Sequence, residues 1–399
     1  KTLYPRIQVI LTAIPLFLNP RGGRSLRICA ATLAPMSQPS ANNALWLDSN
    51  DAFQRHCRQL PPETPVAIDT EFDSTRTYHP VLALVQLAVS PSQCAIVDPL
   101  AITDWRELSH LLSDASRPKL VFSGCNDLPI LVRACGGPHS CLPRAILDLQ
   151  TACGFYGKDA KLSLKAVIES ELGIVLEKSE TRSDWLQRPL TASQLEYAAG
   201  DVALLPQIAK IQEGRLRANG NWDFYLDEMR QFSDPQSYLE PPLEHACHRF
   251  QGFMAKCPPS GQSLIRHLAI WREATARRDD ITRNRILRDE QLIWLAQNRP
   301  RNINALRSMP MARGAVIRAY GEEMLEALAR APEAEDAPPP HAEPRNTPAL
   351  KAKIQILSNR IAKLVQKRAA ERQIDPVLLA TRGQIDALVW RRLQKLPTD

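Results

Sequence analysis

The sequence of 399 residues lacks several features that define other classes of protein. The apolar stretch from Val9 to Leu18 is too short to span a bilayer, and Pro15 interrupts it. The nine cysteines form no CxxC pair with zinc-like partners, which argues against the common structural zinc modules. Their odd number and scattered, often apolar settings favour free buried thiols over a disulfide framework. We therefore expect a cytoplasmic protein without a membrane span.

Acidic residues are absent from the N-terminal stretch 1–47. The run from Val9 to Leu18 matches the apolar part of a signal peptide in length, whereas Met36 resembles a natural start just before the folded part. We expect residues 1–40 to form a disordered or non-native extension. A secretory or organellar targeting segment is the alternative.

Positive charge is concentrated at the C-terminal end of the chain. The whole sequence holds 50 Lys and Arg against 43 Asp and Glu, a formal charge of +7. Residues 347–399 alone hold eleven basic and four acidic residues, an excess that equals the excess of the whole chain. This distribution permits nucleic-acid binding by the C-terminal end, although a basic balance by itself does not prove it.

Hydrophobic patterning predicts a mixed α/β sheet flanked by helices in the part 41–235. Short apolar runs bounded by turn signals predict four strands; they lie at 66–68, 82–89, 95–97 and 120–122. Helical patterns follow, with Asp104 and Asn126 as expected N-caps of the first two; these helices are predicted at 105–113, 127–135, 163–172 and 193–212. Strands first, then strand and helix in alternation, indicate one sheet covered by helices.

The remainder of the chain reads as helical. After a proline-rich break, residues 245–330 are expected to form a small helical domain, with helices at 245–255, 261–277, 289–297, 303–309 and 311–330. Residues 331–348 are acidic and rich in proline, which is the composition of a linker. Residues 349–399 return to a basic helical pattern.

Two acids on the first long strand point to a metal site. Asp69 and Glu71 are two residues apart, so both side chains face the same side of the sheet, while Ile68, Thr70 and Phe72 face the other. Two like charges about 4 Å apart repel by roughly 4 kcal/mol at an effective dielectric constant near 20. A divalent cation would offset that repulsion. The alternative is a solvated strand edge with ordinary surface acids.

Two further acids and a tyrosine could have either a functional or a purely structural role: Asp127, Asp201 and Tyr197. Asp127 follows a predicted strand where a helix begins, a position that often carries function but where an N-cap is the more common role. Tyr197 and Asp201 are four residues apart and share one helical face, which also suits a tyrosine at the rim of an amphipathic helix. Glycine within a helix costs stability, and Gly200 together with Ala198 and Ala199 suggests that something packs closely against that turn.

In combination these motifs closely resemble those of the DEDD exonuclease superfamily, tyrosine subclass. The quoted segments are DTEF at 69–72, the isolated Asp127, and Y-x-x-x-D at 197–201. Further segments are similar, in order and spacing, to the ribonuclease D family: STRTYHP (74–80), LALVQLA (82–88), IVDPL (96–100), LEKSETRSDWLQRPLT (176–191) and EYAAGDVALLPQI (196–208). Residues 261–310 resemble the HRDC module of that family, and 369–388 resemble its second helical module.

The resemblance implies a ribonuclease H-like mixed sheet followed by all-α HRDC-type domains, and a 3′→5′ exoribonuclease that releases nucleoside 5′-monophosphates. Asp69, Glu71, Asp127 and Asp201 would hold two Mg²⁺ or Mn²⁺ ions about 4 Å apart. Tyr197 would orient the attacking water, because a phenol with a pKa near 10 is a poor base at neutral pH. The RNA substrate would be precursor tRNA 3′ ends.

Four residues are candidates to contact the RNA strand: Phe72, Lys178, Arg182 and Trp185. Trp185 suits a core position equally well. Two alternative functions stay open. The five active residues cannot distinguish ribose from deoxyribose, so a DNA-directed exonuclease of the same superfamily is one. A non-catalytic nucleic-acid-binding protein is the other.

Overall fold

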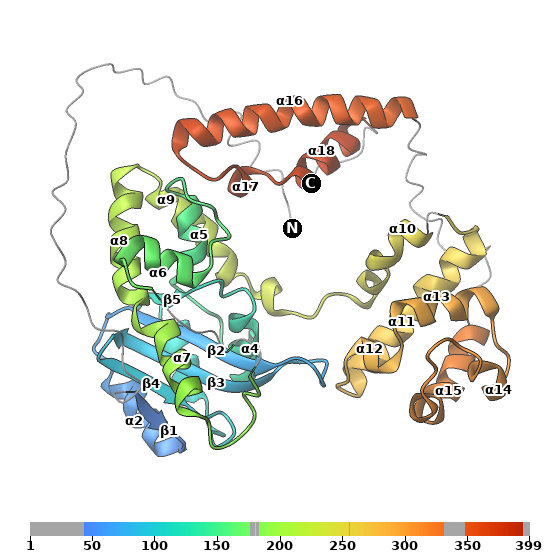
Figure 1. The fold of residues 1–399 in the computed structure, drawn as a ribbon, viewed down its shortest axis with the longest axis horizontal. Helices are drawn as coiled ribbons and strands as arrows, with labels where there is room; N and C mark the ends of the chain where they lie inside the picture. The colour runs from blue at the N-terminus through green and yellow to red at the C-terminus, as the bar shows by residue number, and fades with distance from the viewer. Residues whose placement is uncertain (1–43, 176–179, 181–182, 255, 331–347, 394–399) are drawn as a thin grey trace.

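The computed structural model describes residues 44–175, 180, 183–254, 256–330 and 348–393. Its centre is one mixed six-stranded sheet in the order β1-β4-β3-β2-β5-β6 (Figure 1). The strands are β1 Leu45–Leu47, β2 Val66–Asp73, β3 Val81–Ser90, β4 Gln93–Val97, β5 Lys119–Val121 and β6 Ile146–Asp148. Strand β3 pairs antiparallel with both β2 and β4. The other pairs, β1 with β4, β5 with β2 and β6 with β5, are parallel. The mixed sheet predicted from the sequence is confirmed.

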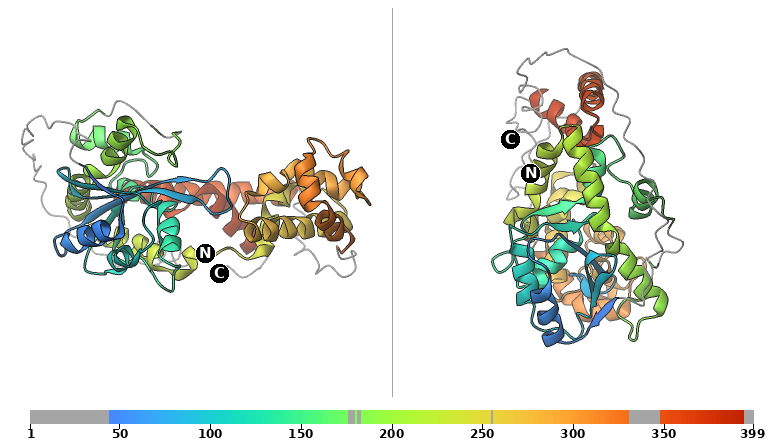
Figure 2. Two further views of the ribbon diagram at one scale, coloured as in Figure 1. Left: turned by 90° about the horizontal axis from the view of Figure 1, so that it is seen from below. Right: turned by 90° about the vertical axis from the view of Figure 1, so that its left-hand side faces the viewer.

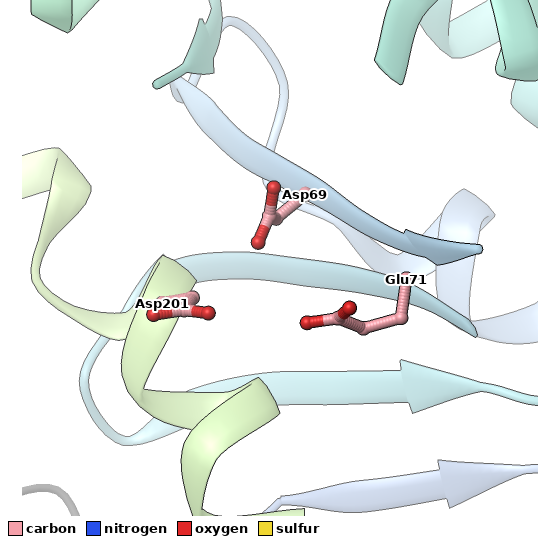
Figure 3. Close-up of side chains that lie close together, drawn as sticks. All are labelled: Asp69, Glu71 and Asp201. Atoms are coloured by element: carbon pink, nitrogen blue, oxygen red, sulfur yellow. The ribbon is translucent and has the colours of Figure 1, made fainter. Parts of the chain in front are cut away.

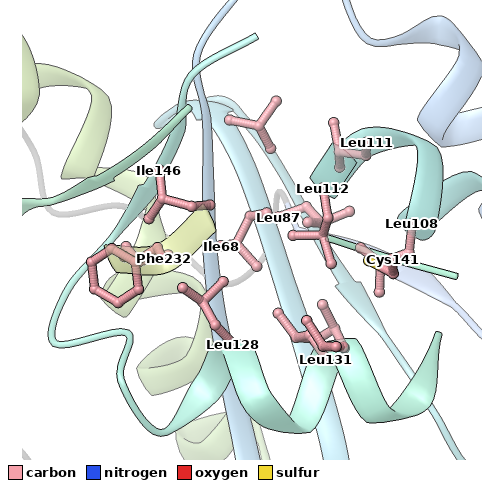
Figure 4. Close-up of a cluster of buried hydrophobic side chains, with 14 of the residues drawn as sticks. Ile68, Leu87, Leu108, Leu111, Leu112, Leu128, Leu131, Cys141, Ile146 and Phe232 are labelled. Carbon is pink, nitrogen blue, oxygen red and sulfur yellow. The ribbon is translucent and has the colours of Figure 1, made fainter. Parts of the chain in front are cut away.

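Helices cover both faces of this sheet. On one face, Ile68 and Leu87 pack against apolar side chains of α3 and α4 (Figure 4). On the other, Ala67, Leu84 and Ala88 pack against α7 and α8. The helices of this part are α2 Asn50–Gln59, α3 Arg106–Ser113, α4 Asp127–Ala134, α5 Leu149–Gly154, α6 Leu164–Leu172, α7 Ala192–Ala203, α8 Leu205–Ala218 and α9 Trp222–Met229.

Several predicted element boundaries are wrong in detail. The single helix expected at 193–212 is divided at Leu204, because Pro206 starts a new helix and has no N–H to continue the previous one. Asn126 occupies the N-cap of α4 as predicted but forms no side-chain capping bond, and Trp105 rather than Asp104 occupies the N-cap of α3. Strands β1 and β6 were missed because three residues are too short to show an alternating pattern.

The chain then forms a helical part with its own apolar core. Its α-helices are α10 Gln251–Met254, α11 Pro259–Arg278, α12 Arg283–Ile286, α13 Asp289–Asn298, α14 Ile303–Leu306 and α15 Gly314–Ala329. The 3₁₀ segments η2 Arg230–Ser233, η3 Pro235–Tyr238 and η4 Leu243–Phe250 lead into it. Most of the helix expected at 245–255 is therefore 3₁₀, and the short α12 was missed.

The tip of the β2–β3 hairpin connects this helical part to the sheet. The Tyr78 hydroxyl donates a hydrogen bond to Glu273 Oε1 of α11 over 2.5 Å. The His79 amide donates to Asp280 Oδ1 over 3.0 Å. Because β2 carries Asp69 and Glu71, the hairpin links the predicted metal site to the helical part (Figures 1 and 2).

The C-terminal segment packs against the sheet part through a close backbone contact. It consists of α16 Pro348–Arg372, α17 Pro376–Leu379 and α18 Arg382–Leu393. The Asp375 amide donates to the Gly154 carbonyl over 2.7 Å, and a Cβ atom at Gly154 would lie 2.5 Å from Leu378 Cδ1. The same Cβ atom would lie 2.8 Å from Ala160 Cβ, which cannot rotate aside, so a side chain at Gly154 would displace its neighbours. The predicted extension 1–40 and nearly all of the predicted linker lie outside the described residues.

Among the residues that the structure describes, no helix is both long enough and apolar enough to cross a bilayer.

Candidate active site

Asp69 and Glu71 project from the central strand β2 toward helix α7. In the alternation of β2 they share a face with Ala67, which belongs to the core beneath α7. Asp201 projects toward them from α7 (Figure 3). One carboxylate oxygen from each of the three acids lies within 4.8 Å of the others. The structure therefore brings together three of the four acids predicted to bind metal.

Small side chains bring α7 close to the sheet. Ala198 and Ala199 are buried in the core on this face, and the Cys94 thiol of β4 reaches the Ala199 carbonyl at 4.0 Å. The close packing expected against this turn is thus confirmed at the two alanines but not at Gly200, where no described atom outside its own helix lies within 4 Å of a Cβ placed there. The two alanines make the close approach, whereas Gly200 borders open space beside Asp201.

Asp127 stands slightly apart from the three clustered acids. It is the first residue of α4, is buried, and accepts a hydrogen bond from the Thr70 hydroxyl over 2.5 Å. Asp148 holds the preceding loop by accepting from the Ser123 amide at 3.4 Å and the Gly124 amide at 3.1 Å. The charge of Asp127 nevertheless reaches Asp69, whose pKa it raises.

The sequence reasoning missed the roles of Thr70 and Asp148. Alternation along DTEF placed Thr70 on the opposite face to the two acids, and that is the side from which α4 approaches. The Thr70 hydroxyl, which lies between Asp69 and Glu71 in the sequence, could therefore have been recognised as a hydrogen-bond donor to Asp127. Asp148 gave no such signal, because its role depends on the contact between two loops distant in the sequence.

Burial raises the pKa of every acid in this site, and the charges of neighbouring site acids raise it further at Asp69 and Glu71. Burial is the largest cause for Asp69, followed by the charges of Asp127, Asp201 and Glu71. Burial and then the charges of Asp201 and Asp127 raise the pKa of Glu71 to about 8. Burial raises the pKa of Asp201 to about 7. Such crowding of acids is unfavourable unless a proton or a cation compensates it.

Tyr197 lies one helical turn before Asp201 and forms a hydrogen bond with it. Burial and then the nearby charges of Asp201 and Glu71 raise the pKa of its phenol well above the ordinary value. The hydroxyl therefore stays protonated near neutral pH and can donate a hydrogen bond. Its ring lies 5.9 Å from the ring of Trp185, centre to centre.

The four candidates for contact with RNA have different environments. Phe72 is half-buried and follows Glu71 across an irregularity in the β2–β3 register, at the edge of the acidic site. Trp185 is only 5% exposed and belongs to the core beneath α7, which matches its alternative as a core residue. Lys178 and Arg182 lie outside the described residues.

Comparison with known proteins first defines the class. Residues 45–216 match a family model described as 3′-5′ exonuclease, and residues 261–328 match the HRDC domain. The sheet and the acidic cluster both lie almost entirely within the first of these matches.

Relatives of similar length define the family. The ribonuclease D of Musicola paradisiaca is 32% identical over 350 residues, which cover 87% of this chain and 90% of that protein. Ribonuclease D of Escherichia coli K12 is 31% identical over 350 residues, which likewise cover 87% of this chain and 90% of that protein. The crystal structure of E. coli RNase D matches with a TM-score of 0.78 at 30% identity, over 89% of this chain and 92% of that one. The chain belongs to the ribonuclease D family.

Membership in this family establishes a hydrolytic 3′→5′ exoribonuclease with RNA as its substrate, and it implies the use of divalent metal. A more distant likeness, to the catalytic core of RRP6 from Trypanosoma brucei, has a TM-score of 0.62 at 17% identity and concerns the fold alone.

Proposed function

We propose that this exoribonuclease uses two divalent cations, Mg²⁺ or Mn²⁺, to release nucleoside 5′-monophosphates from RNA 3′ ends, and that precursor tRNA is among its substrates. The observation that carries the proposal is the cluster of Asp69, Glu71 and Asp201, with carboxylate oxygens within 4.8 Å of one another. We also propose that it acts in the cytoplasm, in line with the described cysteines, which are all free.

The donor set suits a hard divalent cation. Mg²⁺ and Mn²⁺ prefer oxygen ligands, and carboxylates are the usual protein donors for them. The raised pKa values of Glu71 and Asp201 indicate that these acids lack compensating charge in the protein alone. When bound, the cations would lower the pKa of a water molecule and stabilise negative charge at the phosphate and the leaving 3′ oxygen.

Each of the four acids has a different position in the proposed metal site. Asp69 and Asp201 face each other from β2 and α7, so together they define the distance between strand and helix at which a cation is held. Glu71 extends the site along β2 toward Phe72. Asp127 would contribute from the start of α4, where the Thr70 hydroxyl donates a hydrogen bond to its Oδ1.

Tyr197 would orient the attacking water rather than remove its proton. Its raised pKa keeps the phenol protonated, and its hydrogen bond to Asp201 holds the hydroxyl next to the acids. A protonated phenol can direct a water molecule by donating or accepting a hydrogen bond, but it cannot act as a general base.

Specificity for a 3′ end requires a site that admits only a chain terminus. Glu71 and Phe72 are proposed to line it, because they lie at the edge of the acidic cluster. Lys178 and Arg182 are proposed to contact phosphates further along the strand. The proposal of tRNA as substrate is supported by the E. coli relative, which is described as an exoribonuclease involved in structured RNA processing.

The substitution Asp201→Asn tests the site assignment. It removes one charge from the cluster at nearly constant shape, so metal-dependent shortening of 5′-labelled RNA should slow by more than about a hundredfold. RNA binding and folding should be retained. Asp223→Asn is the matched control, since Asp223 is exposed on α9 and outside the cluster.

Unchanged hydrolysis by the Asp201→Asn variant would refute the assignment. The same assay on DNA of matched sequence measures preference for the sugar. Equal rates on both strands would favour a nuclease that does not distinguish ribose from deoxyribose.

A further inference from the structure

Gln86 presents an unexplained polar group in the middle of the sheet. Its exposed fraction is 0%, and among the described residues neither its Nε2 nor its Oε1 atom has a hydrogen-bond partner. A buried polar atom without a partner costs about 1–3 kcal/mol. An apolar residue of similar size would avoid that cost, so the amide calls for a hydrogen-bond partner beyond the contacts it makes in this structure.

The register of the sheet places Gln86 beside the acidic site. Gln86 lies directly opposite Asp69 in the antiparallel pairing of β3 with β2. Side chains at directly opposite positions share a face, with Cβ atoms about 4.5–5.5 Å apart. On its other side Gln86 pairs with Ile96 of β4, which is apolar. Of its two cross-strand neighbours, only Asp69 can form a hydrogen bond with the amide.

Helix α7 covers the part of β3 that carries Gln86. Leu84 and Ala88, two residues to either side of Gln86, belong to the core beneath α7. Asp201 projects from the same helix. The amide therefore lies in an apolar enclosure whose polar side is the carboxylate cluster.

We propose that Gln86 is a positioning residue for Asp69: its Nε2 donates a hydrogen bond to the Asp69 carboxylate when a divalent cation occupies the site. This inference rests on the proposed function. The bond would hold one carboxylate oxygen toward β3 and direct the other toward the cation. Side chains that orient metal ligands in this way commonly affect metal affinity tenfold to a hundredfold.

Thr70 already shows this arrangement at the neighbouring acid. Its hydroxyl donates to Asp127 Oδ1 and so fixes the orientation of that carboxylate. In the proposed arrangement Gln86 orients the Asp69 carboxylate on one face of the sheet, as Thr70 orients the Asp127 carboxylate on the other.

The test is a Mn²⁺ titration of the full chain without RNA, followed by thermal unfolding, for wild type and Gln86→Met. Methionine keeps the length of the side chain and removes both unpartnered atoms. The metal-free variant should unfold at the same temperature or higher. The Mn²⁺ concentration for half-maximal stabilisation should rise about tenfold or more. With RNA, kcat should fall while KM for RNA stays unchanged.

Gln212→Met is the matched control. Gln212 is also a buried glutamine, but its Nε2 donates to the Leu149 carbonyl and also contacts Cys153 Sγ and the Tyr156 hydroxyl. Its replacement should lower the unfolding temperature and leave the response to Mn²⁺ unaltered. Gln86→Leu repeats the test if the methionine variant fails to fold.

A response to Mn²⁺ and a kcat like those of the wild type in the Gln86 variants would overturn the inference. The Asp201→Asn variant separates this failure from that of the proposed function. If Asp201→Asn abolishes the Mn²⁺ response and Gln86→Met does not, only the role of Gln86 is wrong. If Asp201→Asn retains the response, the metal site itself is wrong.

Discussion

At the scale of single residues, the acidic site is built from groups that destabilise one another. Asp69, Glu71 and Asp201 are held within 4.8 Å by a strand and a helix whose positions the surrounding apolar core determines. The fold therefore bears a cost that only protons or cations relieve. Many active sites lower the stability of their protein in this way, because the groups needed for function destabilise the fold.

The pH dependence of stability should reveal that cost. Asp201 has its pKa raised from 3.8 to about 7, and Glu71 from 4.5 to about 8, in each case mainly by burial. A raised pKa stabilises the fold fully below the unfolded-state value, and this contribution is lost as the pH rises through the folded-state value. Without metal, the unfolding temperature should thus fall from about pH 5 to about pH 8.

Differential scanning fluorimetry in the presence of EDTA measures this slope. Asp201→Asn should reduce it, because the amide does not titrate. Addition of Mg²⁺ or Mn²⁺ should raise the unfolding temperature most at the alkaline end, where the acids are ionised. A metal-free unfolding temperature that stays constant over this range would contradict the description of the site.

At the scale of elements, the β2–β3 hairpin joins catalysis to the helical part. Glu273 of α11 accepts a hydrogen bond from Tyr78 at the hairpin tip and is paired with Arg277 and Arg283. Both guanidinium groups also lie over the Tyr78 ring, at 5.7 and 4.9 Å. Because the same hairpin carries Asp69 and Glu71 on β2, this cluster ties the orientation of the acidic strand to the HRDC-like helices.

Breaking this cluster should destabilise the protein in a pH-dependent manner. Burial alone would raise the pKa of Glu273, but hydrogen bonds from Arg283 and Tyr78 outweigh it and lower the pKa to about 2. A lowered pKa stabilises the fold above the unfolded-state value near 4.5, and the contribution is lost as the pH falls through about 2. Glu273→Gln should thus cost about 3 kcal/mol at neutral pH and less under acid.

Chemical unfolding at pH 7 and pH 3 measures both effects. Glu326→Gln on α15 is the matched control, since Glu326 is exposed and pairs with Arg330 one helical turn away. Its loss should cost less than about 1 kcal/mol. Equal effects of the two substitutions at pH 7 would show that the Tyr78 cluster contributes no more than a surface ion pair.

At the scale of the whole molecule, the basic C-terminal segment is attached to the nuclease sheet and exposes its charge. The contact between Asp375 and Gly154 joins the two. Helix α16 presents exposed lysines along its length, among them Lys351, Lys353, Lys363 and Lys367. We predict that these exposed charges contribute to RNA binding by contacting phosphates.

Replacing those four lysines with glutamine should weaken RNA binding. The slope of log affinity against log salt concentration for single-stranded RNA should decrease by up to about 3, because each lost phosphate contact contributes about 0.7. Single-turnover hydrolysis at saturating RNA should stay close to wild type. Three exposed arginines of α2 and α3 serve as the control set: Arg55, Arg58 and Arg106. An unchanged salt slope in the lysine variant would refute a role of α16 in RNA binding.

What the sequence alone determined about this protein is its local order. Alternation of period two put Asp69 and Glu71 on one face of a strand, and a helical spacing of four put Tyr197 and Asp201 on one face of a helix. Both conclusions follow from backbone geometry within a few residues. The order of the motifs then indicated the ribonuclease D family, which the comparisons confirm.

Only the tertiary structure decided how these local pieces meet. That α7 lies over β2, that Thr70 holds Asp127, that Gln86 faces Asp69 and that Trp185 is buried all depend on contacts between distant segments. Burial of apolar side chains on both faces of the sheet sets strand order and register over the whole domain. No local period contains that information, and for this reason the acids were foreseen while the groups that orient them were not.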